Sequence, residues 1–426
     1  MFAGGGSIPL EALRLGCEAY AVELNPVAHI IELCTLVYPQ KYGPSLVADV
    51  KKWGEWVIER AKAQLDEFYP SPPSQSKQHS DDNIVQTTLT GEQDVPQSNS
   101  ALTPIAYLWT RTVPCPNPTC GATVPLVRQT WLRKKEGNYI ALKMTTDHTA
   151  KKVLFERVQA STYQGLGFDP EIGSTRGNTV CLLCGATVNL DYIKQKGRDG
   201  RMGQQLMAVI ATREESKGKI YLDNVREEAY ALSQEFIAQQ IVLLSDKEKI
   251  DRPLEKLQDQ DTLNIKLPLY GLTRFVDLFT PRQLLTLLVF SAQICRAHTY
   301  MLEEGVEPNR AAAITTYLGL LVDKLADRNS TVCRWDNSRE TITNTYARQA
   351  LPMVWDFAEA NPFGGASGGI VGALKWMLEA IQNLVISGQP ALVLRTSAGQ
   401  LPFENGTLDA VITDPPYYDN VSYAVM

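Results

Sequence analysis

The sequence predicts an α/β protein in which a long insertion separates two short α/β segments, one near each end. Three observations predict this class. A glycine cluster at residues 4–6 runs into a helical pattern and then into a short strand at residues 19–24. A second apolar stretch, Leu408–Thr413, has the composition of a buried strand. Between them, two close cysteine pairs lie in a region of different composition.

Composition limits the class of protein further. The 426 residues are 44% hydrophobic and 21% charged, which is enough for a sizeable core and two to three domains. The longest apolar run, residues 284–292, is shorter than the roughly 18 residues that a bilayer helix needs. With no signal-peptide pattern either, the sequence predicts a soluble cytoplasmic protein without a membrane partner.

The glycine cluster has the form of a ligand-binding loop. Glycines let a ligand approach the backbone closely, and the amides at a helix N-terminus favour acidic or electron-rich groups. Glu23 ends the following strand, where a carboxylate can accept hydrogen bonds from ribose hydroxyls. Because such loops also occur as ordinary turns, this motif alone does not identify a ligand.

The tetrapeptide Asp414-Pro415-Pro416-Tyr417 follows the second expected strand. Its prolines stiffen the turn and cannot donate, so the Asp414 carboxylate and a backbone carbonyl can both accept from one planar amino group. Tyr417 offers a ring face on which a base can stack. The alternative is a proline turn that only caps a strand.

Taken together, Phe2-Ala3-Gly4-Gly5-Gly6 and Asp414-Pro415-Pro416-Tyr417 resemble motifs of the amino-methyltransferases that use S-adenosylmethionine to methylate exocyclic amines in DNA. The runs at 10–16, 24–28 and 414–420 are similar to those of the adenine-specific DNA methylases that carry a zinc ribbon. This resemblance implies a Rossmann-like S-adenosylmethionine-dependent methyltransferase core, interrupted by a large insertion with a zinc ribbon and a helical region.

The resemblance also implies roles for individual residues. The loop would hold the methionine part of the cofactor, Glu23 its ribose, and two neighbours would shape the pocket wall. Ser397, in the candidate strand at 392–398, stands where an Asp is more usual and would approach the cofactor adenine. The implied cofactor-binding residues are Phe2, Ala3, Gly4, Gly5, Gly6, Glu23, Asn25, Pro26 and Ser397.

By the same resemblance, Asp414 to Tyr417 would hold a flipped adenine of double-stranded DNA. The implied setting is restriction-modification or phage defence, and the sequence does not identify partner proteins. Cytosine is the alternative base. Because the chain begins inside the glycine loop and stops nine residues after Tyr417, we expect an incomplete core. A catalytically incomplete zinc-ribbon protein that binds nucleic acid is therefore a second interpretation.

Four cysteines predict a structural zinc site: Cys115, Cys120, Cys181 and Cys184. Each pair is followed by the same Gly-Ala-Thr-Val sequence, at 121–124 and 185–188. Two cysteine turns with a glycine after the second sulfur are typical of zinc-ribbon knuckles. The first turn is longer than usual and about sixty residues separate the pairs, so two unpaired cysteine turns are the alternative.

The net charge of −6 hides a basic segment, since residues 111–157 hold nine Lys or Arg and three Asp or Glu. The residues suited to phosphate contact are Arg128, Trp131, Arg133, Lys134, Lys135, Lys194, Lys196, Arg198 and Arg201. An ordinary solvated basic surface is the alternative.

We expect five segments along the chain. Residues 1–69 form the first part of the core with the cofactor loop, and 70–104 a disordered linker. The zinc ribbon occupies 105–220, a mainly helical region 221–385, and the last part of the core 386–426. Thr280-Pro281-Arg282-Gln283 predicts a helix start, and a second helix is expected beside it at 311–325.

Overall fold

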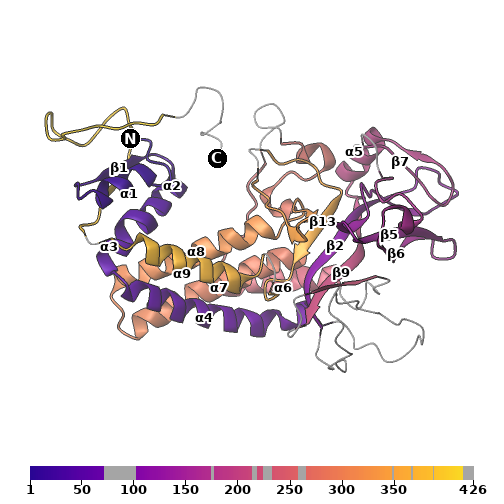
Figure 1. Ribbon diagram of the computed structural model, residues 1–426, viewed down its shortest axis with the longest axis horizontal. Helices are drawn as coiled ribbons and strands as arrows, with labels where there is room; N and C mark the ends of the chain where they lie inside the picture. The colour runs from indigo at the N-terminus through magenta and orange to yellow at the C-terminus, as the bar shows by residue number, and fades with distance from the viewer. Residues whose placement is uncertain are drawn as a thin grey trace.

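The computed structural model describes residues 1–71, 102–173, 177–213, 218–223, 233–257, 265–347, 350–365, 368–386 and 388–415. Its fold is mixed α/β, as predicted. Three parts follow one another along the long axis: a small α/β unit that holds residues from near both ends of the chain, a layer of long helices, and an end rich in β-strands (Figure 1). The expected linker falls mostly on residues 72–101, outside the described residues.

The small unit joins two segments that are far apart in the sequence. Its elements are α1 (Ser7–Arg14), β1 (Tyr20–Glu23), α2 (Pro26–Glu32), a π-helical turn (Leu33–Val37), α3 (Tyr38–Tyr42) and β14 (Leu392–Arg395). β1 and β14 pair in parallel, with Tyr20 opposite Leu392 and Glu23 opposite Arg395. Both strands lie where the sequence predicted them, and they bring the segment after residue 391 beside the glycine loop.

The helical layer contains α4 (Ser45–Leu65), α6 (Gln234–Glu248), α7 (Pro281–Glu303), α8 (Pro308–Arg328) and α9 (Ile370–Leu384). α7 begins as predicted, because Thr280 and Gln283 exchange side-chain to backbone hydrogen bonds of 2.9 and 3.2 Å around Pro281. α8 includes the expected second helix and packs against α7. α4 packs against α7 and α9, so the layer crosses the segment boundary at residue 69.

The main sheet has the strand order β10 (Lys219–Leu222), β9 (Gly203–Arg213), β2 (Leu102–Pro114) and β13 (Asp356–Ala360), with β3 (Thr123–Pro125) also paired to β2. β13 is antiparallel to β2, with Phe357 opposite Trp109. Since β13 comes from the segment expected to be mainly helical, the sheet crosses the boundary at residue 221.

The main sheet is buried on both faces, so β2 is buried over almost its whole length. Tyr107 and Trp109 belong to the same buried cluster as the helical layer. Ala106 and Leu108 belong to a second cluster, shared with the sheet of β4 (Trp131–Lys135), β5 (Asn138–Asp147) and β6 (Lys152–Ala160). Alternate side chains of one strand therefore serve two cores.

The expected buried strand at 408–413 is wrong. These residues have no strand conformation, and Val411 and Ile412 are 56% and 61% exposed. β1 and β14 pair with each other, and no described strand pairs with residues 408–413, so their backbone groups and apolar side chains have no sheet to join. Among the described residues, no helix is both long enough and apolar enough to cross a membrane.

Candidate functional site

Two hairpins hold the four cysteines. Cys115 directly follows β2 and donates its N–H to Ala122 at 2.8 Å, where the chain returns into β3. Cys181 lies between β7 (Thr179–Val180) and β8 (Thr187–Val188) and donates to Ala186 at 2.9 Å. The repeated Gly-Ala-Thr-Val sequence thus forms the same kind of turn in both hairpins. Its glycines need positive φ values, 63° at Gly121 and 76° at Gly185, which the left-handed region allows them.

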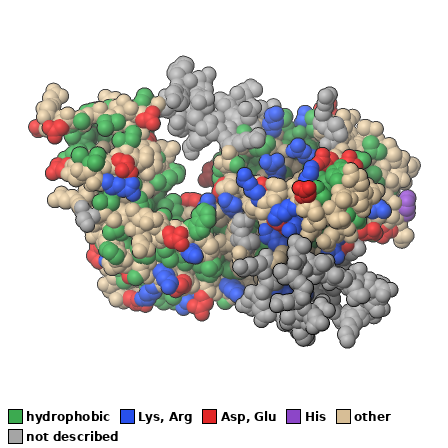
Figure 2. All heavy atoms as spheres, in the orientation of Figure 1, with side chains coloured by type: hydrophobic (Ala, Val, Ile, Leu, Met, Phe, Trp, Pro, Cys, Tyr) green, Lys and Arg blue, Asp and Glu red, His purple; other side chains and the backbone are tan. Residues whose placement is uncertain are grey.

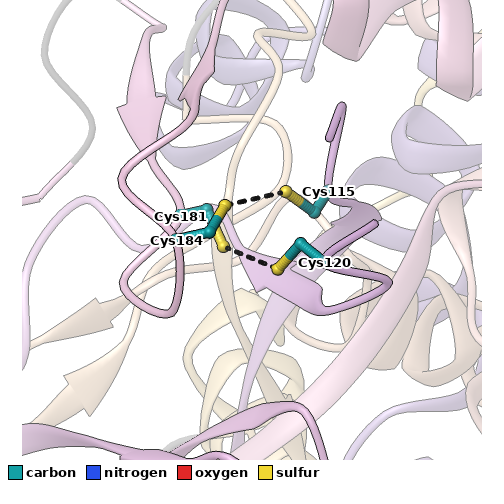
Figure 3. A group of neighbouring side chains, drawn as sticks. All are labelled: Cys115, Cys120, Cys181 and Cys184. Carbon is teal, nitrogen blue, oxygen red and sulfur yellow. Dashed lines mark hydrogen bonds between the residues drawn. The ribbon is translucent and has the colours of Figure 1, made fainter. Parts of the chain in front are cut away.

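The four sulfur atoms fit a tetrahedral zinc ion. All four lie within 4.8 Å of one another, and they face inward from the two hairpins (Figure 3). The Sγ of Cys115 lies 3.6 Å from that of Cys184, and the Sγ of Cys120 lies 3.9 Å from that of Cys181. Zinc–sulfur bonds of about 2.3 Å require sulfur spacings of about 3.8 Å in a tetrahedron. The cluster can therefore hold a metal ion, with no position left for water.

The environments of the thiols differ. Burial raises the pKa of Cys115 to about 12, whereas the N–H of Ala186 lowers the pKa of Cys184 to about 7. Val124 and Val188, the last residues of the two repeats, are buried in a common cluster with Ile193 from α5 (Leu190–Arg198). The two hairpins and α5 therefore form one small unit around the sulfurs.

At the other end of the molecule, the Glu23 carboxylate ties the glycine loop to β1. Its Oε2 accepts the Gly4 N–H at 3.0 Å, and its Oε1 accepts the N–H groups of Leu24 and Asn25 at 2.9 and 3.1 Å. A carboxylate has about four acceptor positions, so three amide hydrogen bonds leave one at Oε2. Glu23 is thus oriented by the backbone and keeps capacity for one more donor.

The glycine loop lies against the π-helical turn. A Cβ atom on Gly6 would come within 2.9 Å of the Thr35 Oγ1 and 3.2 Å of Leu36, so only glycine fits. The Thr35 hydroxyl lies 3.4 Å from the Gly5 carbonyl, at the limit of a hydrogen bond. Wide turns of this kind are frequent at functional sites.

Other residues of the implied cofactor site are placed less directly. Asn25 caps α2 by accepting the N–H of Val27 at 2.8 Å, and Pro26 is the first residue of that helix. Ser397 follows β14, but its hydroxyl accepts the Gly399 N–H at 3.2 Å. Ala3 accepts the Gly6 N–H within the loop, and Phe2 is 39% exposed. The structure therefore brings all nine residues to one end of a two-stranded sheet.

Glu32 is a residue of this region that the sequence analysis missed. Its carboxylate is fully buried, and neither oxygen has a hydrogen-bond partner among the described residues. Burial and the nearby Glu23 carboxylate raise the pKa of Glu32 to about 7. Ala28, Glu32 and Leu36 are four residues apart, so they lie on the same face of a helix. This spacing is the signal in the sequence that could have indicated that Glu32 faces inward.

The segment that ends in Asp414 lies beside the chain's first residue. The amino group of Met1 donates to the Ile412 carbonyl at 3.1 Å, which connects residues 411 positions apart. Asp414 and Pro415 follow directly and are exposed. Pro416 and Tyr417 lie outside the described residues, so their expected contact with a base stays a prediction.

Not all of the residues expected to contact DNA are exposed to solvent. Trp131 is only 3% exposed and packs against Tyr139 and Tyr163, so its expected contact with phosphate is wrong. The Lys134 ammonium lies 2.7 Å from Glu171. Arg128 and Arg201 are exposed. Figure 2 shows Lys and Arg side chains gathered where the helical layer meets the strand-rich end.

Comparison of the chain with protein-family models, with curated proteins and with solved structures gave no match. The functional interpretation therefore depends on the geometry of these two sites.

Proposed function

We propose that the protein transfers a methyl group from S-adenosylmethionine to the exocyclic amine of adenine in double-stranded DNA. One observation carries the proposal. The Glu23 carboxylate, at the end of a strand in parallel pairing, accepts the Gly4 N–H of the glycine loop at 3.0 Å. A loop, a helix and an acidic residue at the carboxyl end of the next strand are the parts with which Rossmann-like folds hold a nucleoside.

The cofactor would be held by the nine residues of the small unit. The free acceptor position of Glu23 suits a ribose hydroxyl, while the backbone of Gly4 and Gly5 lies open to the methionine part: an added Cβ would meet nothing within 4 Å at either glycine. When bound, S-adenosylmethionine supplies an electrophilic methyl group. The half-sheet of β1 and β14 supports the proposal of a Rossmann-like core, of which it would be one part.

Asp414 and the Pro415 carbonyl would bind the target amine. An exocyclic amine is a weak nucleophile because its lone pair is delocalised into the ring. Two acceptors that take its hydrogens favour the geometry in which the lone pair is localised and directed at the methyl donor. The nitrogen of Met1 lies 3.1 Å from the Ile412 carbonyl oxygen, so the Asp414 segment lies beside the start of the glycine loop, which supports this role.

The zinc ribbon would support DNA binding as a structural unit and would take no part in methyl transfer. Four thiolates fill the coordination sphere of zinc, so the ion would stabilise the two hairpins and leave the reaction to the other end of the chain.

The test is transfer of labelled methyl from S-adenosylmethionine to unmethylated DNA, followed by identification of the modified nucleoside. We expect methyladenine, and its loss in Asp414→Ala. Asp409→Ala, an exposed carboxylate five residues earlier in the same segment, is the matched control and should retain activity. Formation of methylcytosine would show that cytosine, not adenine, is the target base. Full activity of Asp414→Ala would contradict the role assigned to Asp414.

A second candidate is a zinc-ribbon protein that binds nucleic acid without catalysis. Residues 409–415 are exposed and pair with no described strand, which favours this candidate, because ligand-binding residues of a Rossmann-like core normally follow a strand of the sheet. Salt-dependent DNA binding without any binding of S-adenosylhomocysteine would favour this candidate over the first.

A further inference from the structure

Three cationic side chains surround one carboxylate at the strand-rich end. Glu340 lies in the turn between β11 (Trp335–Asp336) and β12 (Thr341–Ile342). Its carboxylate accepts from Lys135 and from the Tyr221 hydroxyl, the latter at 2.5 Å, and lies 3.7 Å from the Nε of Arg133. Lys219 donates to the backbone carbonyl of the same glutamate. β4 and β10 therefore direct three positive charges at one residue.

The charges in this cluster do not balance. Glu340 is only 8% exposed, whereas the side chains of Arg133 and Lys135 are 27% and 43% exposed. Burial lowers the pKa of Lys219, and Lys135 and Arg133 lower it further against the effect of Glu340. Positive charge that the carboxylate does not neutralise thus faces solvent, and the buried Nε of Arg133 has no hydrogen-bond acceptor among the described residues.

The basic residues of α5 differ in this respect. Lys194 lies 3.7 Å from Asp191, and Lys196 lies 3.2 Å from Asp199. Each of these lysines has its own carboxylate three residues away on the chain, so the pairs are locally neutral. In contrast to these two lysines, Arg133 and Lys135 of β4 share the single carboxylate of Glu340.

The loop that carries Glu340 is held in place. Trp335 donates its indole N–H to the Leu132 carbonyl at 2.7 Å, and the Lys134 N–H bonds to the Asn337 carbonyl at 3.0 Å. Glu340 itself has a φ of 54°, which a glutamate adopts only when its surroundings fix it. The carboxylate is thus a rigid acceptor that orients flexible cationic side chains.

We propose that Arg133, Lys135 and Lys219 form a binding site for backbone phosphates of DNA, with Glu340 as the positioning residue. The choice of DNA as ligand rests on the proposed function. Guanidinium and ammonium groups bind phosphate oxygens through charge-assisted hydrogen bonds, and the side chains of Arg133 and Lys135 are 27% and 43% exposed. Contacts of this kind fix the position of the duplex without reading its sequence.

The test measures binding of a labelled duplex to the full chain by fluorescence anisotropy, from about 50 to 300 mM KCl. The double variant Lys135→Gln/Lys219→Gln should lose about tenfold in affinity per lost contact near 0.1 M salt, and the salt slope should fall by about one for each. The matched control Lys194→Gln/Lys196→Gln should keep the slope. Equal effects of the two double variants would overturn the proposal.

Glu340→Gln separates phosphate binding from a purely structural role. The amide oxygen of the new side chain can still accept from Lys135 and keep the cationic groups in place, while the negative charge that competes with phosphate is removed, so DNA affinity should rise; an unchanged or lower affinity in the folded variant would overturn the proposal. Tighter binding of an RNA duplex than of the DNA duplex would overturn DNA as the ligand.

Methyl transfer, measured in parallel, distinguishes the two proposals. DNA methylation that does not respond to the β4 and β10 variants would overturn only the phosphate site. Binding that depends on the cluster, without methyl transfer, would support the phosphate site and overturn only the catalytic function.

Discussion

The Arg282 guanidinium and the Glu359 carboxylate form a buried ion pair, with Nε and Oε1 2.7 Å apart, between the helical layer and the main sheet. The Trp109 indole also donates to this carboxylate, at 2.9 Å, and Arg282 donates to the Phe68 carbonyl at 3.1 Å. Burial alone would lower the pKa of Arg282, but Glu359 raises it above its usual range. The pair thus joins α7 to β13 and β2 in one polar network inside the core.

Removal of one charge of the Arg282–Glu359 pair should lower the free energy of unfolding. Glu359→Gln leaves the Arg282 charge buried without a counter-charge, and we expect a loss of about 3–5 kcal/mol in the free energy of unfolding, measured with denaturant. Lys52→Gln, which breaks the exposed pair with Glu304, should cost no more than about 1 kcal/mol. Equal losses in the two variants would show that the buried network does not stabilise the junction.

Zinc should be a structural component of the strand-rich end. We expect about one zinc ion per chain by elemental analysis, and a lower melting temperature after chelation, because the two hairpins share no strand pairing with each other. Cys184→Ser should release zinc and reproduce the lower melting temperature. Cys17→Ser, at an exposed free cysteine outside the cluster, should change neither. Protein that melts at the same temperature with and without zinc would contradict the assignment.

The buried Glu32 should make stability depend on pH. Its pKa is raised to about 7 in the folded state, against about 4.5 for an exposed glutamate, so the folded state holds its proton more tightly. Ionisation of Glu32 does not lower the free energy of unfolding below about pH 4.5. The loss of stability grows as the pH rises towards about 7 and reaches its full size above that pH. Glu32→Gln should therefore stabilise the protein at pH 8, by on the order of 2 kcal/mol, and have little effect near pH 4.5.

Thermal unfolding of both proteins across this pH range measures the effect. The exposed Glu18→Gln, in the same unit, is the control and should change the melting temperature little. A Glu32→Gln effect that does not vary with pH would mean that the carboxyl group is protonated or paired throughout.

Local patterns predicted the parts of the fold that depend on local chemistry. The start of α7 follows from Thr280 and Gln283, which bond within one turn, and the cysteine knuckles follow from a repeated tetrapeptide. Glu23 at a strand end also lies where the pattern indicated. Each of these features is decided by residues within a few positions of one another.

Features that depend on distant surfaces could not be predicted in the same way. The apolar segment at 408–413 reads as a strand, but a strand needs a neighbour with free backbone groups, and composition cannot provide that information. Trp131 reads as an exposed aromatic among cations, yet Tyr139 and Tyr163 bury it. The Arg282–Glu359 pair joins residues 77 positions apart that no local pattern connects.

Glu23 should be the residue on which cofactor binding depends most. Glu23→Ala removes the acceptor of three backbone N–H groups and the free position proposed for the ribose, so both the loop and the ligand lose a partner. We expect at least about a tenfold loss in affinity for S-adenosylhomocysteine, measured by calorimetry, since charged hydrogen bonds contribute about 1.5–3 kcal/mol each. Glu18→Ala, at an exposed position before β1, should bind as the unaltered protein does. Undiminished binding by Glu23→Ala would place the cofactor elsewhere than in the glycine loop.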